Sequence, residues 1–330
     1  MEIIINHGIL HIIDNERGQV VLSETELDLD SDMVTEFLTK HIKKLLGSTA
    51  AKEATFSAES QTYAVISKYI SKEIDFKAVS RELCQSLAQI MLENVSIPAA
   101  DILISQFDIS HRPHLAIFKL NHSVFYTHEV KNGENHIVKS TTALPFAGGK
   151  VTEAAIIPYD PMVIKLMEKP HSISGEEINY FSEIFLGAGC EMSKKEAVKL
   201  IKDILKDIAD EHCGGDPLVA GKFHLALIEE ALENDGDVRL ESVVRHAFGE
   251  EPYGKEFLDA AREAGLGQDI FFGDKFAQKE FGSVKIKSEN GIELKFPIGL
   301  LDDSNIIQFE QRAEIQNGNY IVNIKDMWKS

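Results

Sequence analysis

Lysine side chains recur along one predicted helix, and their spacing points to phosphate contact. In the segment 193–212, four lysines are separated by four, three and four residues, which places them on one face of an α-helix. Val198, Ile201 and Leu205 lie on a second face suited to a core, so the helix can pack and still present ammonium groups to phosphate oxygens. The lysines of this predicted surface are Lys195, Lys199, Lys202 and Lys206, with Lys194 near the start of the helix.

The same pattern has a second interpretation, because acidic residues are interleaved with the lysines. Glu196, Asp203, Asp207 and Asp210 could pair with them as a solubilising salt-bridge surface. A smaller basic cluster ends the helix predicted over 32–46, where cations favour the helix dipole and could also meet phosphates. Its members are Lys40, Lys43 and Lys44.

Residues 240–264 have the pattern of two short helices seen in a helix-turn-helix. The second helix contains Glu256, Asp259 and Glu263, whereas a helix that reads DNA needs donors for phosphates and base edges. Core packing is therefore the favoured interpretation of this segment.

Histidines are concentrated in a strand-rich stretch, where they could act as metal ligands or as an acid/base pair. No carboxylate or cysteine stands beside them at a recognised ligand spacing, so the sequence predicts no metal site and no cofactor. A metal-dependent enzyme that uses this histidine-rich sheet is a weaker alternative. The histidines are His111, His114, His122, His128 and His136.

Other catalytic signatures are incomplete. Residues 147–152 resemble a phosphate loop, but Leu144 stands where that loop needs a glycine and Val151 where it needs a hydroxyl. No G-x-S-x-G nucleophile elbow occurs. We predict no catalytic residues, and therefore that the protein is not an enzyme.

Composition sets further limits on the class of protein. The 330 residues include 53 acidic and 34 basic side chains, for a net charge of −19, which excludes a generic polycationic coat for DNA. No apolar run reaches the roughly 18 to 20 residues that a spanning helix needs, and the first residues do not form a secretory signal. Three scattered cysteines indicate reduced thiols, so a cytoplasmic protein without membrane contact is expected.

The periodicity of apolar residues changes along the chain and predicts an α+β fold. Alternating strands and two amphipathic helices fill residues 1–170, which predicts an antiparallel sheet with covering helices. A helical period dominates residues 171–268, where one helix is expected over 175–186. Short strands with Asn-Gly turns at 290–291 and 317–318 return in residues 269–330. We predict three segments: an α+β domain, a helical module and a small β-rich module.

Several strings in this order resemble those of the bacterial nucleoid-associated proteins of the NdpA/YejK type. They are INHGILHII at residues 5–13, FSEIFLG at 181–187 and SKKE at 193–196. The resemblance implies a non-enzymatic cytoplasmic protein that is found with the nucleoid, takes part in chromosome organisation and binds double-stranded DNA. It carries over no catalytic residues.

Two hypotheses follow for the partner. In the first, the chain binds double-stranded DNA through the local lysine surface, with steep salt dependence. In the second, it is an acidic adaptor that reaches the nucleoid by binding a DNA-processing protein. A homo-oligomer is compatible with either.

Overall fold

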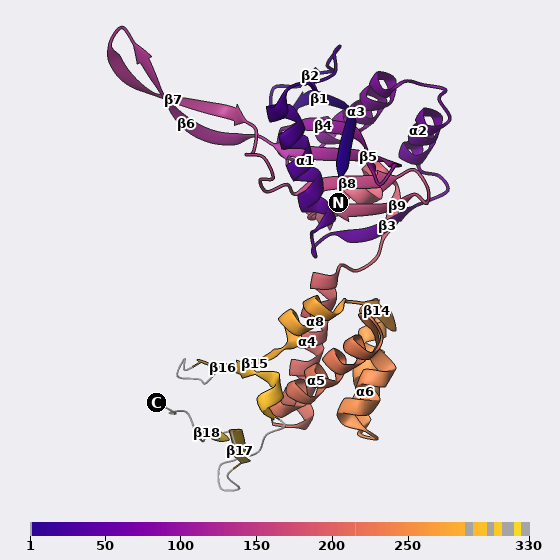
Figure 1. Ribbon diagram of the computed structural model, residues 1–330, viewed down its shortest axis with the longest axis vertical. Coiled ribbons are helices and arrows are strands. Elements are labelled where there is room, and N and C mark those ends of the chain that lie inside the picture. Colours follow the sequence, from indigo (N-terminus) through magenta and orange to yellow (C-terminus); the bar gives the residue numbers. More distant parts are fainter. Residues whose placement is uncertain (1, 215, 288–292, 302–306, 312–319, 325–330) are drawn as a thin grey trace. The chain divides into compact units, whose positions relative to one another are not determined.

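The protein divides into two compact units, Met1–Ser193 and Lys194–Ser330 (Figure 1). The computed structural model describes residues 2–214, 216–287, 293–301, 307–311 and 320–324. The three-segment division expected from the sequence, with boundaries after residues 170 and 268, stays a prediction about which parts fold on their own. Among the described residues, none of the helices combines the length and the apolar character that a membrane-spanning helix requires.

An eight-stranded antiparallel sheet forms the centre of the first unit, in the order β12-β3-β9-β8-β5-β4-β1-β2. β1 and β2 form an antiparallel hairpin at the start of the chain, and β2 is the last strand at its end of the sheet. The strands are β1 (Ile3–Asp14), β2 (Gln19–Val21), β3 (Lys52–Phe56), β4 (Ala100–Ile109), β5 (Arg112–Asn121), β8 (Glu153–Pro158), β9 (Val163–Met167) and β12 (Ala188–Cys190).

Helices cover both faces of this sheet, because its central strands are apolar on both sides. Along β4, Ile102 and Ile104 pack into one core, whereas Leu103 and Phe107 pack into the other. The first core includes α2 (Gln61–Ile70) and α3 (Phe76–Glu93), and the second includes α1 (Asp32–Leu46). The predicted antiparallel sheet with covering helices is confirmed.

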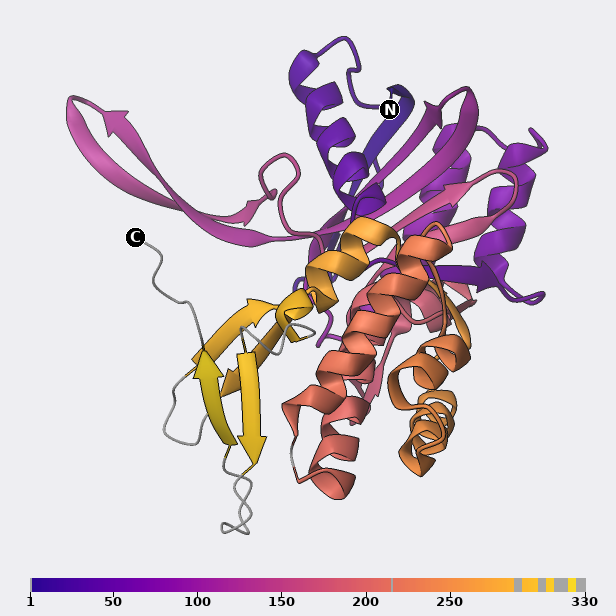
Figure 2. The same cartoon turned by 60° about the horizontal axis from the view of Figure 1, so that its bottom comes forward.

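Two strands leave the sheet as an arm. β6 (Ser123–Lys131) and β7 (Glu134–Ala143) pair only with each other and extend away from the unit (Figures 1 and 2). The turn between them has Asn132 and Gly133 at positive φ, as an Asn-Gly hairpin requires.

The helix predicted over 175–186 is wrong in its first half. A hairpin, β10 (His171–Ile173) and β11 (Glu176–Ile178), precedes a short π-helix over Phe181–Leu186. Ser174 and Gly175 both take positive φ in the turn, and Gly175 does so at no steric cost. The tight turn therefore interrupts a segment that the apolar spacing alone would predict to be one continuous helix.

The second unit contains five helices among its described residues, and the first four lie within residues 171–268, where the sequence predicted a helical module. The shorter α8 was missed because it begins after a glycine and has only two buried residues. The buried core of the second unit includes four phenylalanines, Phe223, Phe257, Phe272 and Phe281. The helices are α4 (Lys194–His212), α5 (Pro217–Glu233), α6 (Leu240–Phe248), α7 (Pro252–Glu263) and α8 (Asp274–Phe281).

Short antiparallel pairs complete this unit. The turns predicted at 290–291 and 317–318 lie outside the described residues, but the strands on either side of each turn pair with one another. The pairs are β13 (Asp237–Arg239) with β14 (Asp269–Phe271), β15 (Ser283–Lys287) with β16 (Glu293–Pro297), and β17 (Ile307–Gln311) with β18 (Tyr320–Ile324); a 3-10 turn spans Ile298–Leu301.

Candidate nucleic-acid interface

Helix α4 has three faces of different chemistry. At about 100° per residue, four of its lysines fall within about 60° of one another around the helix axis. They are Lys195, Lys199, Lys202 and Lys206. Its buried residues form an adjoining face: Ala197, Val198, Ile201, Ile204, Leu205, Ile208 and Ala209. The helix is therefore held by one side and presents a lysine row beside it.

The lysines of α4 divide into exposed and engaged side chains. Lys195, Lys199 and Lys206 are exposed. Lys202 borders the buried face, donates a hydrogen bond to the carbonyl oxygen of Glu280 at 2.8 Å and stands 5.3 Å from the centre of the Phe281 ring. Lys194 donates to the carbonyl oxygen of Phe272 at 3.0 Å.

Burial also changes the electrostatics at Lys202. Desolvation lowers the pKa of its ammonium group, and nearby Lys295 lowers it further, against the opposing effect of Glu280. Lys202 thus fastens α4 to the end of α8, and the lysine row available to a ligand consists of Lys195, Lys199 and Lys206.

An acidic row limits this surface on its other side. Asp203, Asp207 and Asp210 are exposed and lie about 60° to 100° around the helix from the lysines. A polyanion must therefore approach from the lysine side, whereas a basic partner meets the acidic row.

In the second basic cluster, at the end of α1, two of the three lysines already contact other groups of the first unit. Lys40 forms an ion pair with Glu36 at 2.5 Å, one turn earlier. Lys44 donates to the carbonyl oxygens of Gly148 and Gly149 at 2.8 and 2.9 Å. Lys43 is exposed.

The glycine turn that resembles a phosphate loop has the opposite polarity to such a loop. A phosphate loop presents backbone N–H groups to an anion, but residues 148 and 149 present carbonyl oxygens to the ammonium group of Lys44. The amide of Gly149 donates to the carbonyl oxygen of Phe146. The turn therefore holds a cation of the protein itself.

The predicted histidine cluster does not assemble into a metal site. His114 stacks on Phe107 and His122 contacts Asp101 at 3.3 Å, while His128 and His136 lie on the arm. Across the residues that are described, no group of three or more His, Cys, Asp or Glu side chains could hold a metal ion.

Helices α6 and α7 pack together as a small core. A Cβ atom on Gly254 would come within 2.9 Å of the Val244 side chain, so the two helices approach closely at this point. Glu256 contacts His212 of α4 at 2.6 Å and Asp259 pairs with Arg262. These contacts occupy part of the polar surface of the helix that would have to read DNA.

A buried ionic network at the root of the arm was not anticipated. Lys119 and Glu153 face each other on β5 and β8, with 3.8 Å between their charged atoms and no solvent exposure. His171 contacts Glu153 at 2.6 Å, and Asn121 accepts a hydrogen bond from Lys119. Burial lowers the pKa of Lys119 to about 8. The signal in the sequence was a single lysine within the apolar run LAIFKL.

The chain matches a known family over nearly its whole length. Residues 9–324 match the family described as nucleoid-associated protein YejK. The protein therefore belongs to this family of nucleoid-associated proteins, as the resemblance of the short strings suggested. No individually curated protein matches the sequence.

Proposed function

We propose that the protein binds double-stranded DNA non-enzymatically, through the lysine row Lys195, Lys199 and Lys206 on α4. The observation that supports this most directly is that these three side chains share one exposed face of a helix whose adjoining face is buried. Contacts to phosphates position a protein on DNA without reading its sequence, so binding with little sequence preference is expected.

The restricted size of the row sets the expected strength of binding. Each phosphate that a lysine neutralises contributes about 0.9 to the slope of log affinity against log salt, so three lysines account for a slope of about 3. The net charge of −19 opposes approach from any other direction.

The test is fluorescence anisotropy of a labelled 30-base-pair duplex, titrated with the full chain at 50 and 200 mM salt. We expect Lys195→Glu/Lys199→Glu/Lys206→Glu to lower affinity at least tenfold and to flatten the salt slope by about 2 to 3. The matched control is Lys68→Glu/Lys72→Glu/Lys77→Glu, which changes the net charge by the same six units at exposed lysines of the first unit.

The two variants separate a local surface from a general effect of charge. Equal losses in both would mean that only net charge matters, and an unchanged affinity in the α4 variant would place DNA contact elsewhere.

A second candidate function is an adaptor that reaches the nucleoid through a basic DNA-processing protein. The exposed acidic row Asp203, Asp207 and Asp210 favours it. If the wild type fails to bind DNA at 50 mM salt but sediments with isolated nucleoids, the adaptor predicts that reversing these three charges to lysine abolishes sedimentation. Sedimentation that survives the reversal would exclude this surface.

A further inference from the structure

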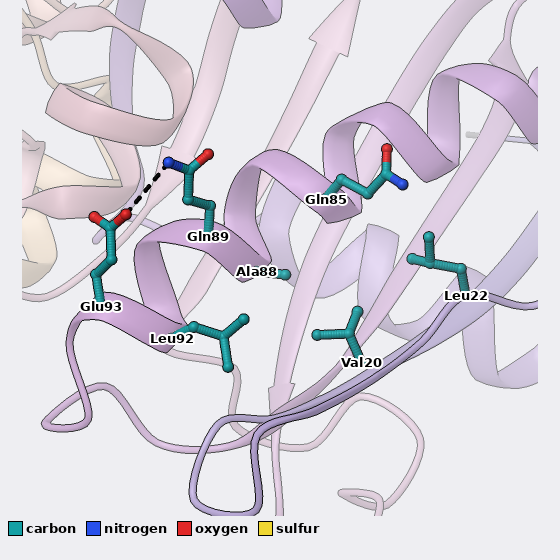
Figure 3. Close-up of a pocket in the computed structure, with 7 residues that line it drawn as sticks. All are labelled: Val20, Leu22, Gln85, Ala88, Gln89, Leu92 and Glu93. Atoms are coloured by element: carbon teal, nitrogen blue, oxygen red, sulfur yellow. Dashed lines mark hydrogen bonds between the residues drawn. The ribbon is translucent and has the colours of Figure 1, made fainter.

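The first unit contains a surface groove and a buried polar cluster, and the two differ in chemistry. The groove lies between Val20 and Leu22 on one side and α3 on the other (Figure 3). Its α3 side includes Gln85, Gln89 and Glu93, and Gln89 donates to Glu93 at 3.3 Å. Among the described residues that line it there is no amine, thiol or hydroxyl, so the groove supplies no nucleophile. The buried cluster at the root of the arm supplies one.

This cluster places an amine against a carboxamide. Lys119 and Asn121 lie two residues apart on β5, so their side chains leave the same face of the strand. Nζ of Lys119 donates a hydrogen bond to Oδ1 of Asn121. The amide carbon lies one bond of about 1.2 Å from that oxygen, so a rotation at the end of the lysine side chain brings the amine against the carbon. These are the two atoms that an amide bond between the side chains would join.

A carboxylate stands beside the amine. Oε2 of Glu153 lies 3.8 Å from Nζ of Lys119, and neither side chain is exposed to solvent. The other oxygen of Glu153 contacts His171 at 2.6 Å, so the carboxylate is held from two sides. A small movement of the lysine end brings the pair within the reach at which a carboxylate acts as a general base.

A hydroxyl links the same carboxylate to the nitrogen of the carboxamide. Nδ2 of Asn121 donates to Oγ1 of Thr152 at 3.0 Å, and this hydroxyl donates to Oε2 of Glu153. Because a hydroxyl proton rotates freely, Thr152 can pass a proton from Glu153 to Nδ2. Asn121 is half-buried, so ammonia released at this point has a path to solvent.

Burial favours the reactive form of the amine. Desolvation lowers the pKa of Lys119 to about 8, against the opposing effect of Glu153. At pH 7 roughly one amine in ten is then unprotonated, compared with fewer than about one in a thousand for an ordinary lysine. Desolvated lysine amines are the ones that act as nucleophiles in proteins.

We propose that Lys119 and Asn121 become joined by an isopeptide bond between their side chains, with Glu153 as the general base. Glu153 accepts a proton from the ammonium group of Lys119, and the lone pair of Nζ forms a bond to Cγ of Asn121. The bond between Cγ and Nδ2 then breaks. Nζ gives up two protons in all, and both pass to Nδ2 by way of Glu153 and Thr152. The nitrogen therefore leaves as an ammonium ion, Glu153 ends as a carboxylate, and no other reactant is needed.

The product removes a buried charge at the point where the arm begins. An ammonium group without solvent exposure is costly even when it is paired, whereas the new amide is neutral and the charge leaves for water with the ammonium ion. Glu153 keeps His171 as its partner. The arm pairs only with itself and exposes apolar side chains such as Ile137, which is 84% exposed, so its root is what fixes it to the sheet. The bond would lock Asn121, the last residue of β5, at this root.

The test is tryptic mapping of the denatured full chain by mass spectrometry. Trypsin does not cleave before Pro113, so without the bond this region gives the fragments 82–119 and 120–131. A lysine whose amine is acylated is not cleaved. The bond therefore yields one fragment, 82–131, that is lighter than its sequence by about 17 Da, the mass of ammonia. We expect this joined fragment in most wild-type molecules.

Two variants assign the roles of the amine and the base. Glu153→Gln keeps the size of the side chain but removes the base, so the separate fragments 82–119 and 120–131 should return. Lys119→Met removes the nucleophile and should give the fragment 82–131 without the mass deficit. Lys165→Met is the matched control, because Lys165 is a half-buried lysine of β9 outside the cluster, and its loss should leave the deficit unchanged.

The wild-type digest decides the proposal by itself, since it needs no variant to fold. Complete cleavage after Lys119 would overturn the proposal. A mass deficit confined to fragment 120–131 would overturn it as well, because Asn121 would then have cyclised onto its own backbone. A deficit that persists in Glu153→Gln at the wild-type level would contradict the assignment of the base.

Discussion

Two lysines in this protein show how the surroundings of an ammonium group decide whether it stabilises the fold or remains available to a ligand. Lys119 of β5 is completely buried beside Glu153 of β8 and donates to Asn121, whereas Lys206 is exposed on α4. Removing a charge from water costs several kcal/mol unless partners replace the lost hydration, so Lys119 belongs to the structure of the arm root. Lys206 keeps its hydration and remains available to a ligand. Lys202, half-buried against Phe281, lies between these extremes.

The largest effect is expected where a buried charge loses its partner. Glu153→Ala leaves Lys119 and His171 buried without their shared carboxylate and should destabilise the first unit by about 3 to 5 kcal/mol. The measurement is urea unfolding, with hydrogen exchange of β5 and β8 peptides. Because removing both charges of a buried ion pair is often neutral, Lys119→Met/Glu153→Gln should recover most of the loss, with the amide still able to partner His171. If Glu153→Ala were as stable as wild type, the buried ionic network would contribute little to the stability of the first unit.

Buried neutral bases should make stability depend on pH. Burial, and to a lesser extent Lys202, lowers the pKa of His224 to about 4 from an ordinary 6.5. Between these values the unfolded chain binds a proton that the folded chain does not, so stability is lost as pH falls from about 6.5 to about 4, by up to about 3 kcal/mol.

Hydrogen exchange of α5 peptides at pH 7, 5.5 and 4.5 measures this effect in the second unit. His224→Leu removes the titrating group and should flatten the pH dependence relative to wild type. Parallel pH profiles for the two proteins would show that carboxylates alone account for the acid sensitivity.

The smallest effects are expected from Lys202 and Lys206, which are neighbours on α4 and should differ in their effects on stability and on DNA affinity. Lys202→Met removes the hydrogen bond to Glu280 and should cost about 1 kcal/mol of stability in the second unit, whereas Lys206→Met should change stability by less than about 0.5 kcal/mol. DNA affinity should respond in the reverse order, falling for Lys206→Met and staying near wild type for Lys202→Met. The same order in both assays would contradict the division of the row.

Periodicity predicted the elements well wherever one face of an element meets the core. The spacing of Val198, Ile201 and Leu205 was enough to place α4, and alternation was enough to place the strands of the sheet. It failed at Gly175, where a turn with positive φ interrupts an apolar pattern that suits a helix. Backbone conformation, which one glycine can change, is not contained in hydrophobic spacing.

The candidate surface could be predicted only in part. The sequence placed four lysines on one face of a helix, but it could not show that Lys202 reaches the end of α8, 78 residues later in the chain. It also gave no sign that Lys119 and Glu153 would meet, because the whole arm separates β5 from β8 in the sequence.

By itself, the sequence determined the family, the alternation of sheet and helices, the net charge and the helical face on which the lysines lie. These depend on residue type and on spacing within one element, which are local properties. Only the tertiary structure decided which lysines stay free of the core, that Lys44 turns its charge toward a glycine turn, and that an apolar arm stands outside the sheet. The reason is physical: burial and pairing depend on neighbours that are distant in the chain, and each of these charges and apolar groups takes its role from those neighbours.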